Sequence, residues 1–248
     1  MSRMQPIPLK VMSFNIHSGV NLAGQLNLQA IASVIMQEKP DLVGLQEVDS
    51  HYSERSDFAD QLEWLADYLG MNGVYGPNLD QDPLQSGMPR RRYGTAILSR
   101  FPVIGSHNHH LSSFGDEQRG LLEAQIQIGA REIFFYNTHL GLSTGQRVQQ
   151  SSEVAETILS QKRAHTVILT GDFNACPGSP ELAVLADAGL ADVFEGLRYE
   201  ANTFPSDQPA DRIDYIWYRG SLVKISAEVL HTQVSDHCPI VAGFTFGG

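Results

Sequence analysis

The chain has 248 residues, of which 28 are Asp or Glu and 17 are Lys or Arg, so its formal net charge is −11. Hydrophobic residues make up 42% and charged residues 18%, which is typical of a globular protein and excludes a disordered chain. This excess of acid also argues against a protein that coats nucleic acid or anionic membrane with its whole surface. This net charge is still compatible with a local basic pocket.

The two cysteines, Cys176 and Cys238, are too few for a disulfide scaffold and lack the spacing of zinc ligands, so we expect two small buried thiols. The first residues lack the apolar core of a signal peptide, and no apolar run approaches the length of a membrane span. We therefore expect a cytoplasmic protein with no stable membrane insertion and no obligate protein partner.

Apolar runs alternate with amphipathic stretches along the whole chain, which predicts one α/β domain over residues 1–248. The first half is expected to contain a strand over 9–16, a helix over 28–36, a strand over 41–48, a helix over 58–69, a loop over 76–92 and a strand over 94–98. The second half is expected to contain a hairpin over 121–128 and 133–138, a helix over 143–162, a strand over 167–169, a short helix after Pro180 and strands over 212–218, 222–230 and 240–246. Many strands with few helices indicate two packed sheets flanked by helices.

Eight polar side chains lie within or just after these strands, namely Asn15, Glu47, His139, Asp172, Asn174, Asp214, Asp236 and His237. A buried carboxylate is costly unless a cation or hydrogen bonds compensate it. Four carboxylates, two histidines and two amides in such positions therefore indicate a functional site rather than isolated turn caps. Acidic oxygens without thiolates favour a hard cation such as Mg²⁺ or Mn²⁺.

Six short motifs follow one another along the chain, namely Ser13-Phe14-Asn15-Ile16, Leu45-Gln46-Glu47-Val48, Asn137-Thr138-His139-Leu140, Gly171-Asp172-Phe173-Asn174, Arg212-Ile213-Asp214-Tyr215-Ile216 and Ser235-Asp236-His237. Together they resemble the signature of the endonuclease/exonuclease/phosphatase superfamily, which includes pancreatic-type deoxyribonuclease, apurinic endonucleases, neutral sphingomyelinases and inositol polyphosphate phosphatases. The resemblance covers residues 13–237. It implies a four-layer α/β/β/α sandwich, in which two packed mixed sheets are flanked by helices.

The resemblance also implies a role for each matching polar residue. Glu47 takes the place of the principal metal ligand, and Asp236 helps to hold this metal or a second one. Asn15 lies beside Glu47 in the metal site, with its amide oxygen on metal-bound water or its amide nitrogen on a phosphate oxygen. Asp214 pairs with His237, which either activates water or stabilises the phosphoryl oxygen.

For the remaining motif positions, the resemblance makes Asp172 the other candidate to orient the attacking water. Asn174 binds a phosphoryl oxygen or the nucleophile, and an extended backbone over 172–174 would place both side chains on one face. His139 donates a hydrogen bond to the phosphate, although a structural histidine is the alternative. Arg119 is a looser match to an arginine that approaches the phosphate.

Three consecutive arginines, Arg90, Arg91 and Arg92, lie at the end of the long loop over 76–92. They form either an ordinary solvated charge run or an electropositive rim that attracts a phosphorylated substrate. Three arginines are too few to define a nucleic-acid track, and only Tyr93 is close enough in the sequence to stack on a base.

These features support a metal-dependent phosphoesterase that acts on a small or lipid-derived phosphate by in-line attack of water. A nuclease of the same catalytic design, with DNA or RNA as substrate, is the alternative. A binding module that keeps the fold without catalysis is the third hypothesis. It is disfavoured because each of the quoted motifs retains a chemically competent residue.

Overall fold

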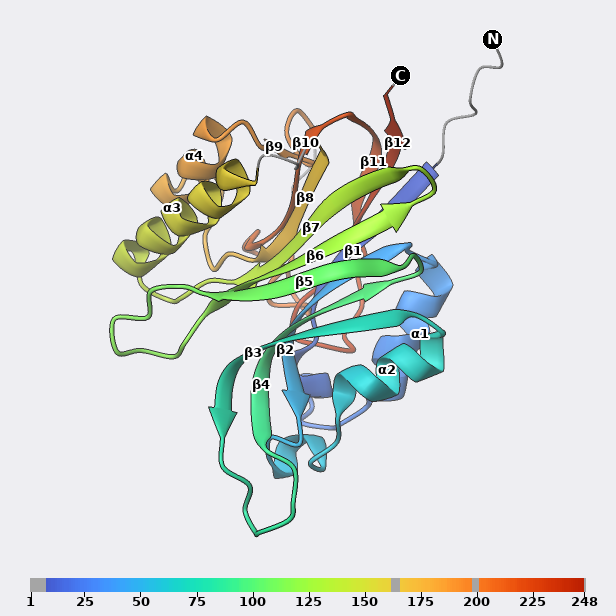
Figure 1. The fold of residues 1–248 in the computed structure, drawn as a ribbon, viewed down its shortest axis with the longest axis vertical. Coiled ribbons are helices and arrows are strands. Elements are labelled where there is room, and N and C mark those ends of the chain that lie inside the picture. The colour runs from blue at the N-terminus through green and yellow to red at the C-terminus, as the bar shows by residue number, and fades with distance from the viewer. Residues whose placement is uncertain (1–7, 162–165, 198–200, 248) are drawn as a thin grey trace.

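The computed structural model describes residues 8–161, 166–197 and 201–247, which form two six-stranded sheets packed face to face (Figure 1). The first sheet and its helices comprise β1 (Pro8–Asn15), η1 (His17–Gly19), α1 (Leu28–Glu38), β2 (Leu42–Ser50), η2 (Glu54–Ser56), α2 (Gln61–Leu69), β3 (Asn72–Gln81), β4 (Arg91–Ser99), β11 (Leu222–Val229) and β12 (Ile240–Phe246). The second comprises β5 (Val103–His110), β6 (Gly120–Ile128), β7 (Arg131–His139), α3 (Thr144–Ser160), β8 (Thr166–Asp172), α4 (Pro180–Asp187), β9 (Ala191–Asp192) and β10 (Asp214–Gly220).

Both sheets are mixed, with the strand orders β11-β12-β1-β2-β4-β3 and β5-β6-β7-β8-β10-β9. Helices α1 and α2 lie on one side of the molecule and α3 and α4 on the other, with the sheets between them (Figure 1). This arrangement confirms the predicted α/β/β/α sandwich.

The alternation of side chains along each strand explains the layers. On β1, Val11 belongs to the apolar cluster between the two sheets, whereas Met12 and Phe14 belong to the cluster beneath α1 and α2. On β7, Phe135 likewise faces the first sheet, and Phe134 packs in the cluster beneath α3 and α4. Three separate apolar layers therefore hold the four structural layers together.

The predicted loop over 76–92 is wrong at both ends, because β3 continues to Gln81 and β4 begins at Arg91. Proline is tolerated at Pro77 because β3 is an edge strand and its pairing register shifts between Pro77 and Leu79. Strand β5 is also an edge strand. Its polar sequence lacks a sustained apolar run, and it was not predicted.

One helix start differs from the prediction. Helix α2 begins at Gln61, because the side chain of Asp60 accepts a hydrogen bond from the Glu63 amide and caps the helix. Helix α3 begins directly after Ser143, as predicted, although the Ser143 side chain makes no capping bond.

Two further expectations concern thiols and membranes. Cys238 is buried as expected, whereas Cys176 is exposed beside Asp211, so the prediction of two buried thiols is half wrong. Among the helices in the described ranges, none is both long and apolar enough to cross a membrane.

The sheet topology places several strand ends at one edge of the sandwich. Strands β1 and β2 are parallel, as are β7 and β8, so their carboxyl ends point the same way within each pair. His139 at the end of β7 opposes Asp172 at the end of β8, and Asp172 opposes Asp214 at the start of β10. Three residues of separate motifs therefore lie side by side across the second sheet.

Candidate active site

Asp172 lies at the centre of a buried cluster of polar side chains. Its Oδ2 accepts a hydrogen bond from Asn15 Nδ2 at 3.0 Å, and it lies 3.5 Å from His139 Nε2 and 3.6 Å from His237 Nε2. Its Oδ1 accepts a hydrogen bond from the Asn174 amide at 2.9 Å. Burial raises the pKa of Asp172 above the usual carboxyl range, and the nearby Asp214 adds to this rise.

His237 is held by Asp214 in the loop that precedes β12. Its Nδ1 lies 2.9 Å from Asp214 Oδ2, and the ring of Phe204 packs against it with centroids 4.8 Å apart. Burial alone would lower the pKa of His237, but Asp214 and then Asp172 outweigh burial and raise it to about 10. The imidazole is therefore protonated at neutral pH in the metal-free protein.

Glu47 reaches the cluster because β2 is irregular at this point. The pairing of β2 with β4 shifts register between Leu45 and Val48, and Glu47 has a positive φ of 57°. Such a bulge redirects one side chain out of the regular alternation. The half-buried Glu47 consequently accepts a hydrogen bond from Asn15 Nδ2 at 3.0 Å.

Asn15 turns its amide nitrogen toward the cluster. The backbone amide of His17 donates to Asn15 Oδ1 at 3.0 Å, which fixes the orientation of the side-chain amide. Asn15 Nδ2 thus lies between Glu47 and Asp172 and donates to both carboxylates.

His139 carries no charge at neutral pH. Burial lowers its pKa well below the usual histidine range, and the positive charges of Arg119 and His237 lower it further. Arg119 is itself buried and pairs with Glu117 at 3.0 Å, while its Nε has no hydrogen-bond partner among the described residues. Arg119 therefore lies close enough to His139 for its charge to act on the imidazole.

Two other predicted positions, Asn174 and Asp236, remain. Asn174 has a φ of 49° and donates its side-chain amide to the Leu140 carbonyl, so the backbone over 172–174 is not extended and does not place Asp172 and Asn174 on one face. Asp236 is only partly buried; its Oδ1 accepts a hydrogen bond from Ser235 Oγ and lies 3.8 Å from His17 Nδ1.

The three arginines do not form a free positive rim. Arg90 pairs with Asp80 and Asp82 at 2.6 and 2.7 Å, and Arg92 lies 3.5 Å from Asp80. Arg91 donates its Nε to the backbone carbonyl of Asp82 and lines a separate cavity.

Residues 12–237 match the Endonuclease/Exonuclease/phosphatase family. The chain belongs to this family. It is 29% identical to YbhP of Escherichia coli K12 over 96% of each chain. Its fold is similar to that of a mannosyl-6-phosphatase from Bacteroides thetaiotaomicron, with a TM-score of 0.79 and 21% identity over 96% of this chain and 100% of that one. The catalytic domain of human Nocturnin with bound sulfate gives a TM-score of 0.72 and 23% identity over 99% and 100%.

A network of polar side chains lies beneath the candidate active site, and no role was assigned to it from the sequence. Gln46 Nε2 donates to Asn137 Oδ1 at 2.7 Å, and Asn137 Nδ2 donates to the backbone carbonyls of Leu45 and Ala96. The network joins the two sheets directly under the strand ends. The two amide side chains within apolar strands were the sequence feature that could have indicated this network.

An aromatic and cationic cluster beside Glu47 was also missed. Arg55 makes a bidentate ion pair with Asp49 and lies 5.0 Å and 5.1 Å from the ring centroids of Tyr52 and Tyr93. The hydrogen bond to Asp49 is the main cause of the raised pKa of Arg55, and burial is the main cause of the raised pKa of Tyr93. The charge of Glu47 adds to both shifts. No local sequence pattern distinguishes these residues from ordinary loop residues.

Membership of this phosphoesterase family implies a hard cation at the site, and the side chains present there fit such a cation. Asp172, Asp214 and His237 form a buried group whose ligand atoms all lie within 4.8 Å of one another. Asp214 Oδ1 is buried and has no hydrogen-bond partner among the described residues, which leaves one carboxylate oxygen available. A buried acceptor without a partner is unfavourable unless a cation or water contacts it. The cluster could therefore bind a metal.

Proposed function

We propose that the chain is a divalent-metal-dependent hydrolase of phosphate esters that acts on small or lipid-derived phosphates by in-line attack of water. The position of Asp172 Oδ2 carries this proposal, because nitrogen atoms of Asn15, His139 and His237 all lie 3.0 to 3.6 Å away. A carboxylate that can accept a proton is thus surrounded by groups that can bind phosphoryl oxygens.

The nitrogen groups bind and stabilise the phosphoryl oxygens. His237 is protonated while paired with Asp214, so its Nε2–H donates to an oxygen on which negative charge develops. Neutral His139 donates through Nε2 without adding a charge, and the Asn15 amide supplies a further donor.

Asp172 is the residue that we assign to the attacking water. Its raised pKa makes it a stronger base than an exposed carboxylate, and the Asn174 amide fixes its orientation. A protonated His237 cannot accept the proton of water, so Asp172 is favoured over His237 as the general base.

Glu47, with Asp236, is assigned to hold Mg²⁺ or Mn²⁺. The buried group of Asp172, Asp214 and His237 could hold the cation only if His237 first lost a proton, because a protonated imidazole paired with Asp214 cannot act as a ligand. When bound, such a cation offsets the negative charge that develops on the phosphoryl oxygens.

A nuclease of the same design is the competing function, and the charges favour a small substrate. Four site carboxylates account for part of the net charge of −11, and −7 remains on the rest of the chain. Two of the three consecutive arginines are compensated by Asp80 and Asp82. Little free positive charge is therefore offered to a nucleic-acid backbone by this loop.

The test is a panel of substrates with purified protein and Mg²⁺ or Mn²⁺, namely plasmid DNA, abasic DNA, sphingomyelin, inositol phosphates and bis-p-nitrophenyl phosphate. We expect turnover of small or lipid-derived phosphates with a shallow dependence on salt. Preferred cleavage of DNA, with an apparent affinity that falls steeply as salt rises, would favour the nuclease.

A further inference from the structure

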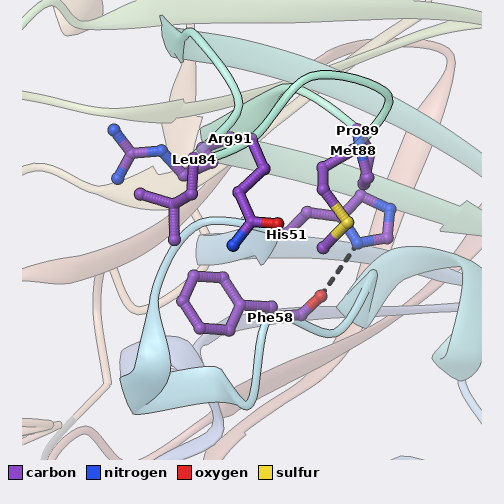
Figure 2. A pocket seen from close by; sticks show the side chains of 7 residues that line it. His51, Phe58, Leu84, Met88, Pro89 and Arg91 are labelled. Carbon is purple, nitrogen blue, oxygen red and sulfur yellow. Dashed lines mark hydrogen bonds between the residues drawn. The ribbon is translucent and has the colours of Figure 1, made fainter.

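A mostly apolar cavity of about 160 Å³ lies between the segment that follows β2 and the tip of the β3–β4 hairpin (Figure 2). Phe58, Leu84, Met88 and Pro89 supply its apolar walls, and the polar side chains of His51 and Arg91 also line it. An apolar cavity of roughly 150 Å³ is large enough for a ligand of about six carbon atoms.

The hairpin side of the cavity exposes two large apolar side chains. Leu84 is 63% exposed and Met88 is 56% exposed, although they belong to an acidic protein. Both side chains are flexible and can adapt to the shape of a ligand. Their exposure in one short loop leaves an apolar patch at the cavity.

The opposite side of the cavity is rigid. His51 Nδ1 bonds to the Phe58 carbonyl at 2.8 Å, as Figure 2 shows, and His51 and Phe58 have positive φ values of 54° and 52°. Such φ values are unfavourable for residues other than glycine, so this backbone persists only where its surroundings fix it. This wall is therefore formed before any ligand binds.

The cavity lies beyond the end of β2, the strand that carries Glu47. His51, which lines the cavity, follows Glu47 by four residues, so the chain places the two at most about 14 Å apart. Tyr93 opposes Asp49 in the adjacent strand. Burial raises the pKa of Tyr93, and the charge of the nearby Glu47 adds to this rise. A substrate that is held at Glu47 and is long enough to span this distance can therefore place its apolar part in the cavity.

Arg91 gives the cavity a positive charge. Arg90 and Arg92 both lie beside Asp80, whereas among the described residues Arg91 pairs with no carboxylate. Its charge is consequently available to an anionic substrate whose apolar part enters the cavity.

We propose that this cavity binds an alkyl or acyl chain carried by the phosphoester substrate, with Arg91 attracting the negatively charged part of the molecule. This inference rests on the proposed function and narrows its substrate class to amphiphilic, lipid-derived phosphates. A chain fits better than a flat ring because Leu84 and Met88 can close around it.

The experiment measures the affinity of ethyl, butyl and octyl phosphonate by calorimetry in the presence of Mn²⁺. Each buried CH₂ contributes about 0.8 kcal/mol, roughly a fourfold gain in affinity. We expect octyl phosphonate to bind at least about tenfold more tightly than ethyl phosphonate. In the double variant Leu84→Asn, Met88→Asn, this gain should disappear while ethyl phosphonate binds as before.

Ile225→Asn is the matched control, because Ile225 on β11 is also 63% exposed and belongs to the far edge of the first sheet. It should keep the full gain. An equal affinity for ethyl and octyl phosphonate, no binding of octyl phosphonate, or an undiminished gain in the double variant would overturn the cavity proposal. Tighter binding of benzyl than of octyl phosphonate would overturn the assignment to a chain. The substrate panel tests the proposed function separately, since turnover of small phosphates can persist when the cavity proposal fails.

Discussion

The Oδ2 atom of Asp214 lies 2.9 Å from His237 Nδ1, and both side chains are buried. An ionised carboxylate only accepts hydrogen bonds, so Nδ1 carries a proton and Nε2 faces Asp172 and Asn15. The pair thereby fixes both the orientation and the charge of the imidazole that we assign to the phosphoryl oxygen.

Replacing Asp214 with Asn should remove the charge that keeps His237 protonated. We expect kcat to fall by roughly 10²–10⁴, as when a positioned acid or base is lost, and the pKa of His237 to fall. The pH dependence of kcat/KM and an NMR titration of His237 would measure both effects. His109→Gln is the control, because His109 pairs with Glu123 at 3.2 Å away from the site and should leave both measurements unchanged.

Stability of the metal-free protein should fall as pH rises through the range between 6.5 and about 10. The pKa of His237 is raised from 6.5 to about 10 in the folded state, so its contribution is complete below pH 6.5 and is lost as pH approaches 10. The slope approaches about 1.4 kcal/mol per pH unit for one group.

Urea unfolding in EDTA at several pH values measures this dependence. His237→Asn should flatten the curve relative to the unaltered protein. Identical curves for the two proteins would mean that His237 does not hold the extra proton.

Replacing Glu47 with Gln should weaken the binding of the catalytic Mg²⁺ or Mn²⁺. We expect the Mg²⁺ or Mn²⁺ concentration for half-maximal activity to rise at least about tenfold, because one charged ligand is lost. Glu54→Gln is the matched control, since Glu54 is an exposed acid in the segment that follows β2. Full activity of Glu47→Gln at limiting metal would remove Glu47 from the ligand set.

Gly44 allows the two sheets to approach each other beneath the site. A Cβ atom at this position would lie 2.0 Å from Thr170 Oγ1 and 2.7 Å from Asn137 Oδ1. We therefore expect Gly44→Ala to lower the free energy of unfolding by about 1–3 kcal/mol.

The double variant Gly44→Ala, Thr170→Ala removes the shorter of these contacts and should recover part of the loss. Chemical denaturation of the single and double variants gives the coupling energy. Additive losses in the double variant would show that the sheets can shift to accommodate the methyl group.

The fold could be predicted largely because apolar runs and strand-end polar residues are local signals. Strand β12 was predicted with its observed bounds, and the family motifs implied the sandwich. Strand β5 escaped prediction because an edge strand with polar side chains carries no apolar period, and β3 because Gly76 and Pro77 indicate a loop.

The site could be predicted as a set of residues but not as a geometry. The sequence indicates that Asn15 and Glu47 belong together, whereas the bulge that turns Glu47 inward and the backbone bond that orients Asn15 arise only from the pairing of strands. The same holds for Arg90, whose charge is compensated by Asp80 across the hairpin. Long-range pairing of this kind leaves no local trace in the sequence.

The central claim is best tested by the hydrolysis of bis-p-nitrophenyl phosphate by the unaltered protein and by His237→Ala, each in EDTA and after addition of Mg²⁺ or Mn²⁺. We predict release of p-nitrophenolate that is abolished by EDTA, restored by metal and reduced by at least about 10² in His237→Ala. Turnover that is equal in both proteins, or that persists in EDTA, would contradict the account.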